Sequence, residues 1–176
     1  MYRRCFTFTM YESLFDRFPL FQELTPEQSS LVRPLFSAGY ETAGRSLFEQ
    51  GELAEGLYLV VEGEAIIRFK PEDGPAILIA RVRAGGVVGW STVLGNPTYT
   101  SSAVCTTDCE TLYIRGQDFR IFCEKYPDTG SLLLDRLARI VAERLRASHE
   151  NVIALLEQGI QVNEQKTLTT DKFVEY

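Results

Sequence analysis

The chain has 176 residues, a formal net charge of −6 and a pI near 4.9, with 45% hydrophobic and 24% charged residues. This length and composition suit one globular domain with a small accessory element. The acidic balance excludes a broad footprint for nucleic acid or an anionic membrane, because neutralising phosphate requires clustered Lys and Arg. No apolar run approaches the roughly 20 residues that span a bilayer. We therefore expect a cytoplasmic protein without a nucleic-acid or membrane partner.

The N-terminal stretch MYRRCFTFTM has too short an apolar segment for a signal peptide. Met10 stands directly before the helical pattern of YESLFDRF and is a candidate start, so residues 1–9 are interpreted as an upstream extension. The next signal is a helix start, because Thr25 precedes Pro26 and Gln28 lies three residues beyond the threonine. An N-cap, a first-position proline and a capping box therefore coincide. We expect short helices up to about Phe36.

The cysteines carry no metal-site pattern. The four of them, Cys5, Cys105, Cys109 and Cys123, form no C-x-x-C pair, and the chain has a single histidine. A zinc site therefore lacks ligands. We expect buried free thiols and no metal.

From Tyr40 onwards the hydrophobic period changes to two, in short apolar runs that glycines divide. The runs lie in GRSLFEQGELAEGLYLVVEGEAIIRF, AILIARVRAGGVVGW and SSAVCTTDCETLYI. PEDG at 71–74 is typical of a hairpin turn between two of them. Short strands at near-regular spacing predict a mainly β fold, an antiparallel β-barrel or jelly roll, and not a βαβ fold. This domain, with its flanking helices, is expected over residues 10–130.

A long C-terminal helix is expected over residues 131–159, with Ser131 as its cap and Gly159 at its end. At about 1.5 Å per residue it would measure roughly 40 Å, longer than a small domain needs for its own core. The tail at 160–176 has no strong period and is expected to be poorly ordered or to pack as a small appendage.

Two apolar stripes run along this expected helix. The first has the spacing of a coiled-coil seam: Leu134, Ala138, Val141, Leu145, Ser148, Val152 and Leu155. The second, of Leu133, Leu137 and Ile140, stops halfway. The first half therefore has enough apolar surface for the barrel and a partner helix, which predicts a homodimer through this helix. The alternative is one long helix packed on its own barrel.

The order of short helices, a glycine-punctuated barrel, a phosphate-cassette-like turn and a long helix resembles the cyclic nucleotide-binding domain of the catabolite-activator and FNR type. The resemblance covers about Leu14 to Leu156. It rests on the joint spacing of Gly44, Gly51, Tyr58, Gly63, Gly86 and Gly89, followed by LYIRGQDFRIFCEKYP. It implies a double-stranded β-helix with short N-terminal helices and a long C-terminal helix. Gly89 is the glycine expected to face a ligand, since glycine lets ligands approach main-chain N–H groups.

The chain departs from this family at the two anchors of its phosphate cassette. After its glycine the family has a glutamate that grips the ribose, a short helix whose amides face the phosphate, and an arginine followed by a small hydroxyl residue. Here Trp90 stands in place of the glutamate and Thr100, followed by Ser101, in place of the arginine. No Lys or Arg occurs from Ala84 to Ile114.

The energetics of this loss are large. Removing one member of a buried charge pair costs roughly 3–5 kcal/mol, or about 150- to 5,000-fold in affinity. A helix N-terminus returns only about 0.3–1 kcal/mol. Arg81 and Arg83 alternate with apolar residues and are expected to face solvent. We therefore expect no binding of cAMP or cGMP through the usual contacts.

The cassette instead offers neutral hydroxyls and flat apolar faces, which suit a neutral or weakly polar effector. The alternative is that Trp90 fills the pocket as core. Ser148 and His149, in RLRASHENV, resemble the part of the family's long helix that touches the base of the nucleotide, often across the dimer; otherwise they lie on a solvated helix face. The candidate ligand-binding residues are Gly89, Trp90, Ser91, Thr92, Tyr99, Thr100, Ser101, Ser148 and His149.

Taken together, these features predict a regulatory or sensor module that binds another small molecule or acts as a dimeric interaction domain with an unidentified protein partner. A transcription factor is the first competitor, but the 17 residues after Gly159 are too few for a three-helix DNA reader. An enzyme is the second, yet a metal-dependent cupin needs two or three histidines, and no G-x-S-x-G elbow or P-loop occurs. We expect no catalytic residues and no obligatory cofactor. A cyclic nucleotide sensor with an atypical cassette, or a truncated CRP/FNR-type regulator, remains the alternative.

Overall fold

The computed structural model describes residues 15 and 18–146. The chain divides into two compact units, residues 1–141 and 142–176, and the first contains both sheets. Within the described ranges, no helix has the length and apolar content needed to cross a membrane.

The N-terminal helices are short, as the capping signals predict. They are η1 (Pro19–Phe21), α2 (Pro26–Val32) and η2 (Arg33–Leu35). The capping box forms: the Thr25 Oγ1 accepts the Gln28 N–H at 3.2 Å, and the Gln28 Oε1 accepts the Thr25 N–H at 3.0 Å. Local sequence is therefore sufficient to set the start of α2.

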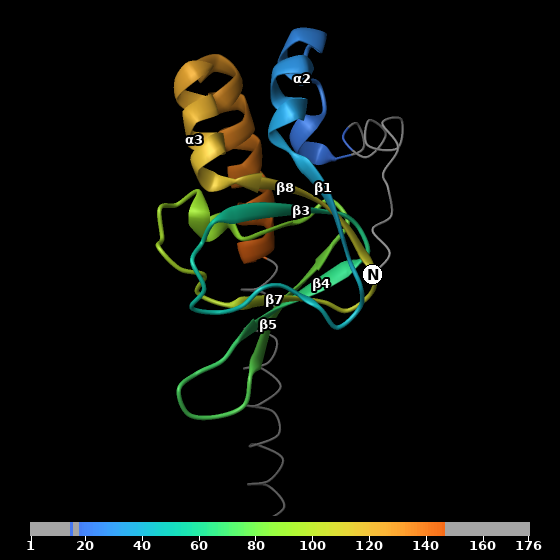
Figure 1. The fold of residues 1–176 in the computed structure, drawn as a ribbon, viewed down its shortest axis with the longest axis vertical. Helices are drawn as coiled ribbons and strands as arrows, with labels where there is room; N and C mark the ends of the chain where they lie inside the picture. Colours follow the sequence, from blue (N-terminus) through green and yellow to red (C-terminus); the bar gives the residue numbers. More distant parts are fainter. Residues whose placement is uncertain (1–14, 16–17, 147–176) are drawn as a thin grey trace, which may run out of the picture. The chain divides into compact units, whose positions relative to one another are not determined.

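Two four-stranded antiparallel sheets follow in the described chain (Figure 1). The first has the order β1-β8-β3-β6, formed by Ser37–Glu41, Cys109–Arg115, Gly56–Glu62 and Val87–Val88. The second has the order β2-β7-β4-β5, formed by Ser46–Phe48, Ser102–Cys105, Glu64–Phe69 and Ile77–Arg83. The predicted mainly β jelly-roll fold is confirmed.

The hairpin predicted at PEDG joins β4 to β5. The two strands pair antiparallel from Glu64 opposite Arg83 to Phe69 opposite Ile77. The Lys70 ammonium donates to the Gly74 carbonyl at 3.1 Å and helps to close the loop. Figure 1 shows this hairpin reaching away from α2 and α3.

Two separate cores hold the first unit together. The first, called here the helix-side core, lies between the first sheet and the helices; it includes Leu59 of β3, Leu112 of β8 and Phe119 of α3 (Gly116–Lys125), all fully buried. The second, the inter-sheet core, lies between the two sheets and consists of Phe48, Val60, Ile67, Val82, Val88, Tyr99 and Ala103. Strand alternation explains the division, because successive side chains of β3 point to opposite faces.

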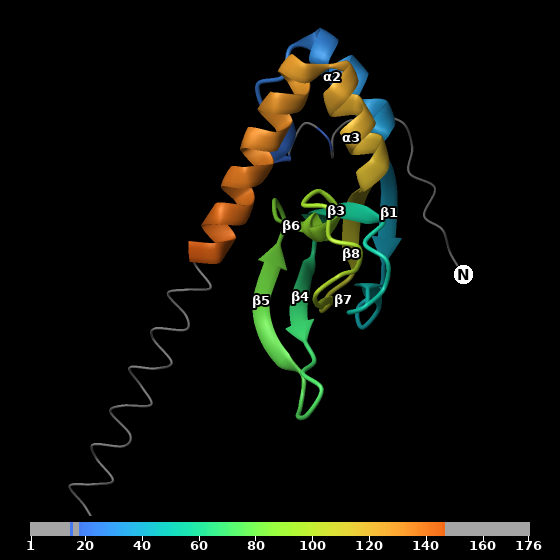
Figure 2. The ribbon, with the colours of Figure 1, turned by 90° about the vertical axis from the view of Figure 1, so that its left-hand side faces the viewer.

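The last described helix begins at residue 127 and not, as predicted, at Ser131. Pro127 takes the first helical position, which suits proline because no N–H is required there. Gly130 lies in the first turn, where a Cβ would stand 2.7 Å from the Cα of Cys123 on α3. The glycine therefore permits the two helices to approach closely here, and Figure 2 shows them meeting at this end and diverging from it. Gly159, the predicted end, lies outside the described residues.

The two stripes of this helix have different surroundings. Leu133 and Leu137 are buried in the helix-side core, whereas Leu134 is 40% exposed and Ala138 is exposed. Val141 is half-buried and Leu145 is exposed, while Ser148, Val152 and Leu155 lie outside the described residues. Within the described part of the seam, Leu134, Ala138 and Leu145 are thus exposed, whereas Val141 packs against the helix-side core.

Candidate functional site

The cassette turn is built on a left-handed glycine. Gly89 has φ 82° and caps the short helix η3 (Trp90–Thr92). A Cβ on Gly89 would lie 2.5 Å from the Gly56 carbonyl oxygen and 3.4 Å from the rings of Phe48 and Tyr99. Both the backbone angle and this contact therefore require glycine. The close neighbours of Gly89 are protein atoms.

Three aromatic rings pack together beside Gly89 and are called here the aromatic plug: Phe48, Tyr58 and Tyr99. The Phe48 and Tyr99 rings stack with centroids 3.8 Å apart and an interplanar angle of 18°. The Tyr58 ring lies 5.9 Å from that of Phe48. Phe48 and Tyr99 belong to the inter-sheet core, and Tyr58 packs against it. The space between the sheets next to the cassette is therefore occupied by side chains of the chain itself.

The hydroxyl of Tyr99 is bound internally. It donates to the Gly56 carbonyl at 2.7 Å and accepts the Gly56 N–H at 3.0 Å. Burial raises the pKa of both Tyr99 and Tyr58 above the usual range for tyrosine. Tyr99 therefore stays neutral, and its polar atom already has two partners. Its place in the predicted ligand-binding set stays a prediction, and in this structure its ring packs between the sheets.

Trp90 does not join the aromatic plug. Its half-buried side chain packs against the helix-side core, on the other side of the first sheet from the inter-sheet core. The two predicted uses of Trp90, as a ligand contact or as a core residue that fills the pocket, stay predictions; its packing here is on the helix-side core and not among the plug residues.

The cassette hydroxyls differ in their burial and in their surroundings. Thr92 is buried beneath the start of α3, where a Cβ on Gly116 would lie 2.0 Å from its Oγ1. Ser91 is half-buried, and its carbonyl accepts the Asn96 N–H at 3.0 Å. Thr100 is exposed and Ser101 half-buried. Ser148 and His149 lie outside the described residues.

Sequence reasoning missed a polar group on the adjoining edge of the second sheet. The buried Ser102 Oγ accepts the Gln50 N–H at 2.9 Å. Glu49 accepts a hydrogen bond from Ser46, and the bonds from Ser46 and Ser102 lower the pKa of the Glu49 carboxyl. The hydroxyls of the SSAV stretch are visible in the sequence as candidate polar groups. Their acidic partner, Glu49, lies about fifty residues earlier in the chain, and pattern analysis does not join segments so far apart.

The arginines nearest in sequence to the cassette pair with a glutamate on the neighbouring strand. Arg81 and Arg83 form ion pairs with Glu64 at 2.9 and 3.0 Å, and their side chains are 56% and 80% exposed. Hydrogen bonds from Arg83 and then Arg81 hold the pKa of Glu64 below its ordinary value. The expectation that both arginines face solvent is confirmed.

The thiols of the described chain are free, as predicted. Cys105 and Cys109 are buried and Cys123 is half-buried. Burial raises the pKa of Cys105 to about 12, so this thiol stays protonated and is a poor nucleophile. Cys5 lies outside the described residues. Among the described residues, no three His, Cys, Asp or Glu side chains gather to hold a metal.

Comparison with known proteins relates this architecture to a family of ligand-responsive regulators. Residues 42–126 match the cyclic nucleotide-binding domain family. The chain is 30% identical over 128 residues to the cyclic AMP receptor protein of Thermus thermophilus, covering 73% of this chain and 57% of that relative. A cAMP-activated global transcriptional regulator of Salmonella typhimurium is 31% identical over 108 residues, covering 61% of this chain and 50% of the relative. The chain thus spans about half the length of these curated relatives, which are regulators and not enzymes.

Solved structures give the same result for the fold. The catabolite activator protein of Thermus thermophilus superimposes with a TM-score of 0.62 at 28% identity, covering 78% of this chain and 62% of that one. The regulatory subunit of a cAMP-independent protein kinase A from Trypanosoma brucei has a TM-score of 0.65 at 19% identity, covering 84% and 51%. The second match supports the fold alone.

Proposed function

Because this chain belongs to the cyclic nucleotide-binding domain family, with relatives among the CRP/FNR regulators, we propose that it is a regulatory module that does not hold cAMP or cGMP by the standard cassette contacts. The observation that carries the proposal is the aromatic plug. Phe48 and Tyr99 stack between the sheets at the cassette glycine. A nucleotide that entered beside Gly89 would have to displace them.

The cost of opening this space adds to the cost of the missing charges. Displacing Tyr99 separates a stacked ring pair worth about 0.5–1.5 kcal/mol beyond its buried area. It also breaks two buried hydrogen bonds to Gly56 of about 1 kcal/mol each. Added to roughly 3–5 kcal/mol for a buried phosphate without a charge partner, this supports very weak binding of an anionic cyclic nucleotide.

The module is proposed to act as a homodimer. Leu134 and Ala138 are exposed on the side of the helix away from Leu133 and Leu137, which belong to the helix-side core. An apolar seam on one helix face suits a second copy of the same helix. Its output would pass to an unidentified protein partner or depend on a neutral small effector. DNA binding is an unsuitable role for this chain, because its net charge is negative.

Isothermal calorimetry of the full chain with cAMP and cGMP tests the first part of the proposal. We expect no saturable heat, with the cyclic AMP receptor protein of Thermus thermophilus as positive control. A dissociation constant below about 10 µM would overturn the proposal and favour a sensor with an atypical cassette.

The double variant Trp90→Glu, Thr100→Arg then separates the two barriers to binding, the missing charges and the filled space. We expect this variant still to bind no cyclic nucleotide while Tyr99 is present. Binding by this variant would assign the loss of nucleotide affinity to the missing charges alone.

Native mass spectrometry of freshly purified chain tests the rest. A dimer mass for the unsubstituted chain that falls to the monomer mass in Leu134→Lys supports the helix seam. Ile121→Lys, on the exposed side of α3, is the matched control. A bare monomer contradicts the dimeric module. The proposal also expects no DNA binding. An electrophoretic mobility shift of random duplex DNA at low salt would contradict this expectation.

A further inference from the structure

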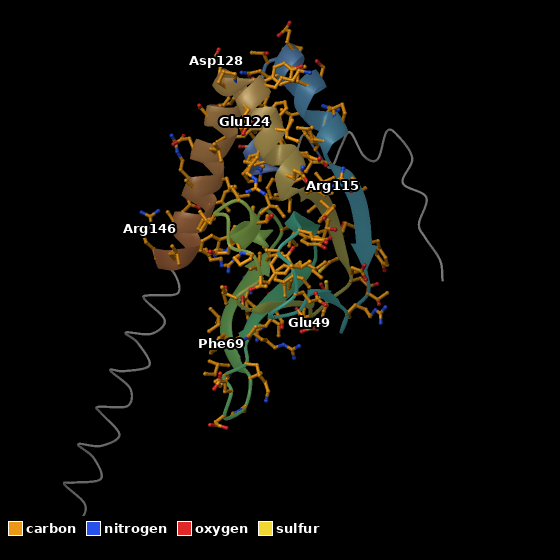
Figure 3. All side chains as sticks on the ribbon, turned by 60° about the vertical axis from the view of Figure 1, so that its left-hand side comes forward. Glu49, Phe69, Arg115, Glu124, Asp128 and Arg146 are labelled. Carbon is orange, nitrogen blue, oxygen red and sulfur yellow. The ribbon has the colours of Figure 1, made fainter. Side chains whose placement is uncertain are left out.

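Two of the buried thiols lie at the two ends of one short connection between the sheets. Cys105 is the last residue of β7 in the second sheet, and Cys109 is the first residue of β8 in the first sheet. Both are buried, at 1% and 0% exposure, whereas the turn 106–108 between them is exposed. Arg115, the last residue of β8, is seen near α3 in Figure 3, so Cys109 begins this strand at its other end. The two thiols thus lie directly beneath a surface turn, at the end of β8 away from α3.

Both cysteines meet the same short part of the chain around the start of β4. Cys105 stands opposite Ala65 in the register of β4 and β7. The Cys109 thiol donates to the Glu64 carbonyl, with an Sγ–O distance of 3.3 Å. A Cβ on Gly63 would lie 2.9 Å from the Cys109 Sγ, so this glycine leaves room for the thiol. Consecutive residues at the start of β4 therefore bring the two cysteines to the same place.

The two thiols also interact directly. Burial and a hydrogen bond with Cys109 raise the pKa of Cys105. A hydrogen bond raises the pKa of an acid when the protonated form donates it, so the Cys105 S–H is the donor and the Cys109 sulfur is the acceptor. When Cys109 loses its proton, the same bond stabilises its thiolate, whereas Cys105 stays protonated. The pair is therefore unequal, with Cys109 as the first nucleophile and Cys105 as the second.

We propose that Cys105 and Cys109 form a dithiol site that a hydroperoxide converts into an internal disulfide. The Cys109 thiolate attacks the terminal oxygen of the hydroperoxide, and the O–O bond breaks. The other oxygen leaves as water or an alcohol after taking up the proton that Cys109 lost. The Cys105 sulfur then attacks the sulfenic sulfur of Cys109, the S–OH bond breaks, and the hydroxyl leaves as water with the proton of Cys105. The two thiols thus lose two electrons, which the hydroperoxide gains.

Opening of the surface turn is sufficient to admit a small oxidant. Residues 106–108 belong to no strand, so the paired strands stay in place when this turn opens. The turn is held on Glu64, which accepts the Thr106 N–H at 2.8 Å and donates its own N–H to the Thr107 Oγ1 at 2.9 Å. The disulfide then ties β7 to β8 and joins the two sheets covalently at this corner. The site is separate from the helix seam and does not depend on the proposed function.

Peptide mapping of the full chain after treatment with hydrogen peroxide tests the proposal without any substitution. Catalase removes the oxidant, the chain is denatured, free thiols are blocked with N-ethylmaleimide, and trypsin digests the product. Both cysteines fall in the peptide 84–115, because no Lys or Arg occurs from Ala84 to Ile114. We expect this peptide to lose two hydrogen atoms and take up no maleimide, and to take up two maleimides when dithiothreitol is added before blocking. A peptide that takes up two maleimides without dithiothreitol, or one joined by a disulfide to Cys5 or Cys123, would overturn the proposal.

Single variants test the order of attack. In Cys105→Ala the sulfenic acid on Cys109 has no second thiol to close on, so dimedone should trap it. In Cys109→Ala the protonated Cys105 should take up roughly ten-fold less dimedone. The matched control is Cys123→Ala, which removes the half-buried thiol packed against the helix-side core and should form the disulfide like the unsubstituted chain. Equal dimedone labelling of Cys105 and Cys109, or loss of the disulfide in Cys123→Ala, would contradict the proposed site; should a variant fail to fold, peptide mapping of the unsubstituted chain decides.

Discussion

The two cores of this domain are filled in different ways. The helix-side core is built from aliphatic and phenylalanine side chains, with Phe15 and Phe21 stacked at 3.6 Å and T-shaped contacts to Phe36. The inter-sheet core holds small aliphatic residues around a tyrosine whose hydroxyl is tied to the backbone. The first is a packing core that any sequence of this fold needs. In the second core, the stacked rings of Phe48 and Tyr99 fill the space beside the cassette glycine, Gly89.

Under the proposed function, this contrast is how a binding fold is kept while the space beside its cassette glycine is filled. The turn geometry at Gly89 survives, because the fold itself requires a left-handed residue against Gly56. The volume beside it is occupied by the stacked rings of Phe48 and Tyr99, and the Tyr99 hydroxyl is hydrogen-bonded to Gly56. Retention of the cassette turn is therefore no sign of nucleotide binding, and the side chains that face the turn decide the question.

The largest effect is expected in the helix-side core. Phe119→Ala should lower the free energy of unfolding by about 4 kcal/mol, because it removes a fully buried ring and leaves a cavity under the helices. Urea denaturation followed by circular dichroism measures the change, with the exposed α3 residue Ile121→Ala as control. A loss no greater than that of the control would mean that the helices contribute little to the stability of the sheets.

Tyr99→Ala should come second and should distinguish the two cores. We expect a loss of about 3 kcal/mol, because the ring stacked on Phe48 is removed along with its bonds to Gly56. The cavity between the sheets should then accept p-cresol, which has the same ring and hydroxyl, and the melting temperature should rise with its concentration. The unsubstituted chain should show no such rise. Equal responses to p-cresol would mean that the inter-sheet space is not filled by Tyr99.

Much of the fold was predictable because its signals are local. The capping box at Thr25 and the turn at PEDG each lie within four residues, and both formed as expected. The start of the last helix was placed four residues late, because Ser131 was taken as its N-cap, whereas the helix already begins at Pro127. Gly130, within the first turn, serves the contact with Cys123 of α3 through its small size.

The side chains that fill the site could not be predicted from local sequence. Phe48, Tyr58 and Tyr99 come from β2, β3 and the loop before β7, and each has an ordinary alternating or loop context in the sequence. Their convergence depends on which strands the two sheets bring face to face. Period-two patterning gives the side of a strand on which a residue lies, but it does not give the strand that packs opposite. Tyr99 was therefore selected as a residue of interest from its position, while its partner Phe48 was missed.

Removing only the Tyr99 hydroxyl should have a smaller effect. Tyr99→Phe keeps the stack on Phe48 but leaves the Gly56 N–H and carbonyl without their side-chain partner in a buried place, at a cost of about 1–2 kcal/mol. Tyr58→Phe, at the edge of the plug, is the matched control. Thermal unfolding measures both. If Tyr99→Phe were neutral, the plug would be held by ring packing alone, and the inter-sheet core would resemble the helix-side core more closely.

The smallest effect is expected outside both cores, on the surface of the second sheet. Glu64 has a pKa lowered by its bonds to Arg83 and Arg81, so its charged form is favoured in the folded state. That contribution is present above the pKa of the unfolded carboxyl and is lost as the pH falls through the folded value. Glu64→Gln should therefore lower the melting temperature slightly at neutral pH, with the difference from wild type disappearing in acid and shrinking in high salt. Glu124→Gln on α3 is the control. A difference that persisted unchanged in acid would mean that Glu64 acts through packing beside Thr106, and that the outer layer of this sheet shares the pH-independent stability of the cores.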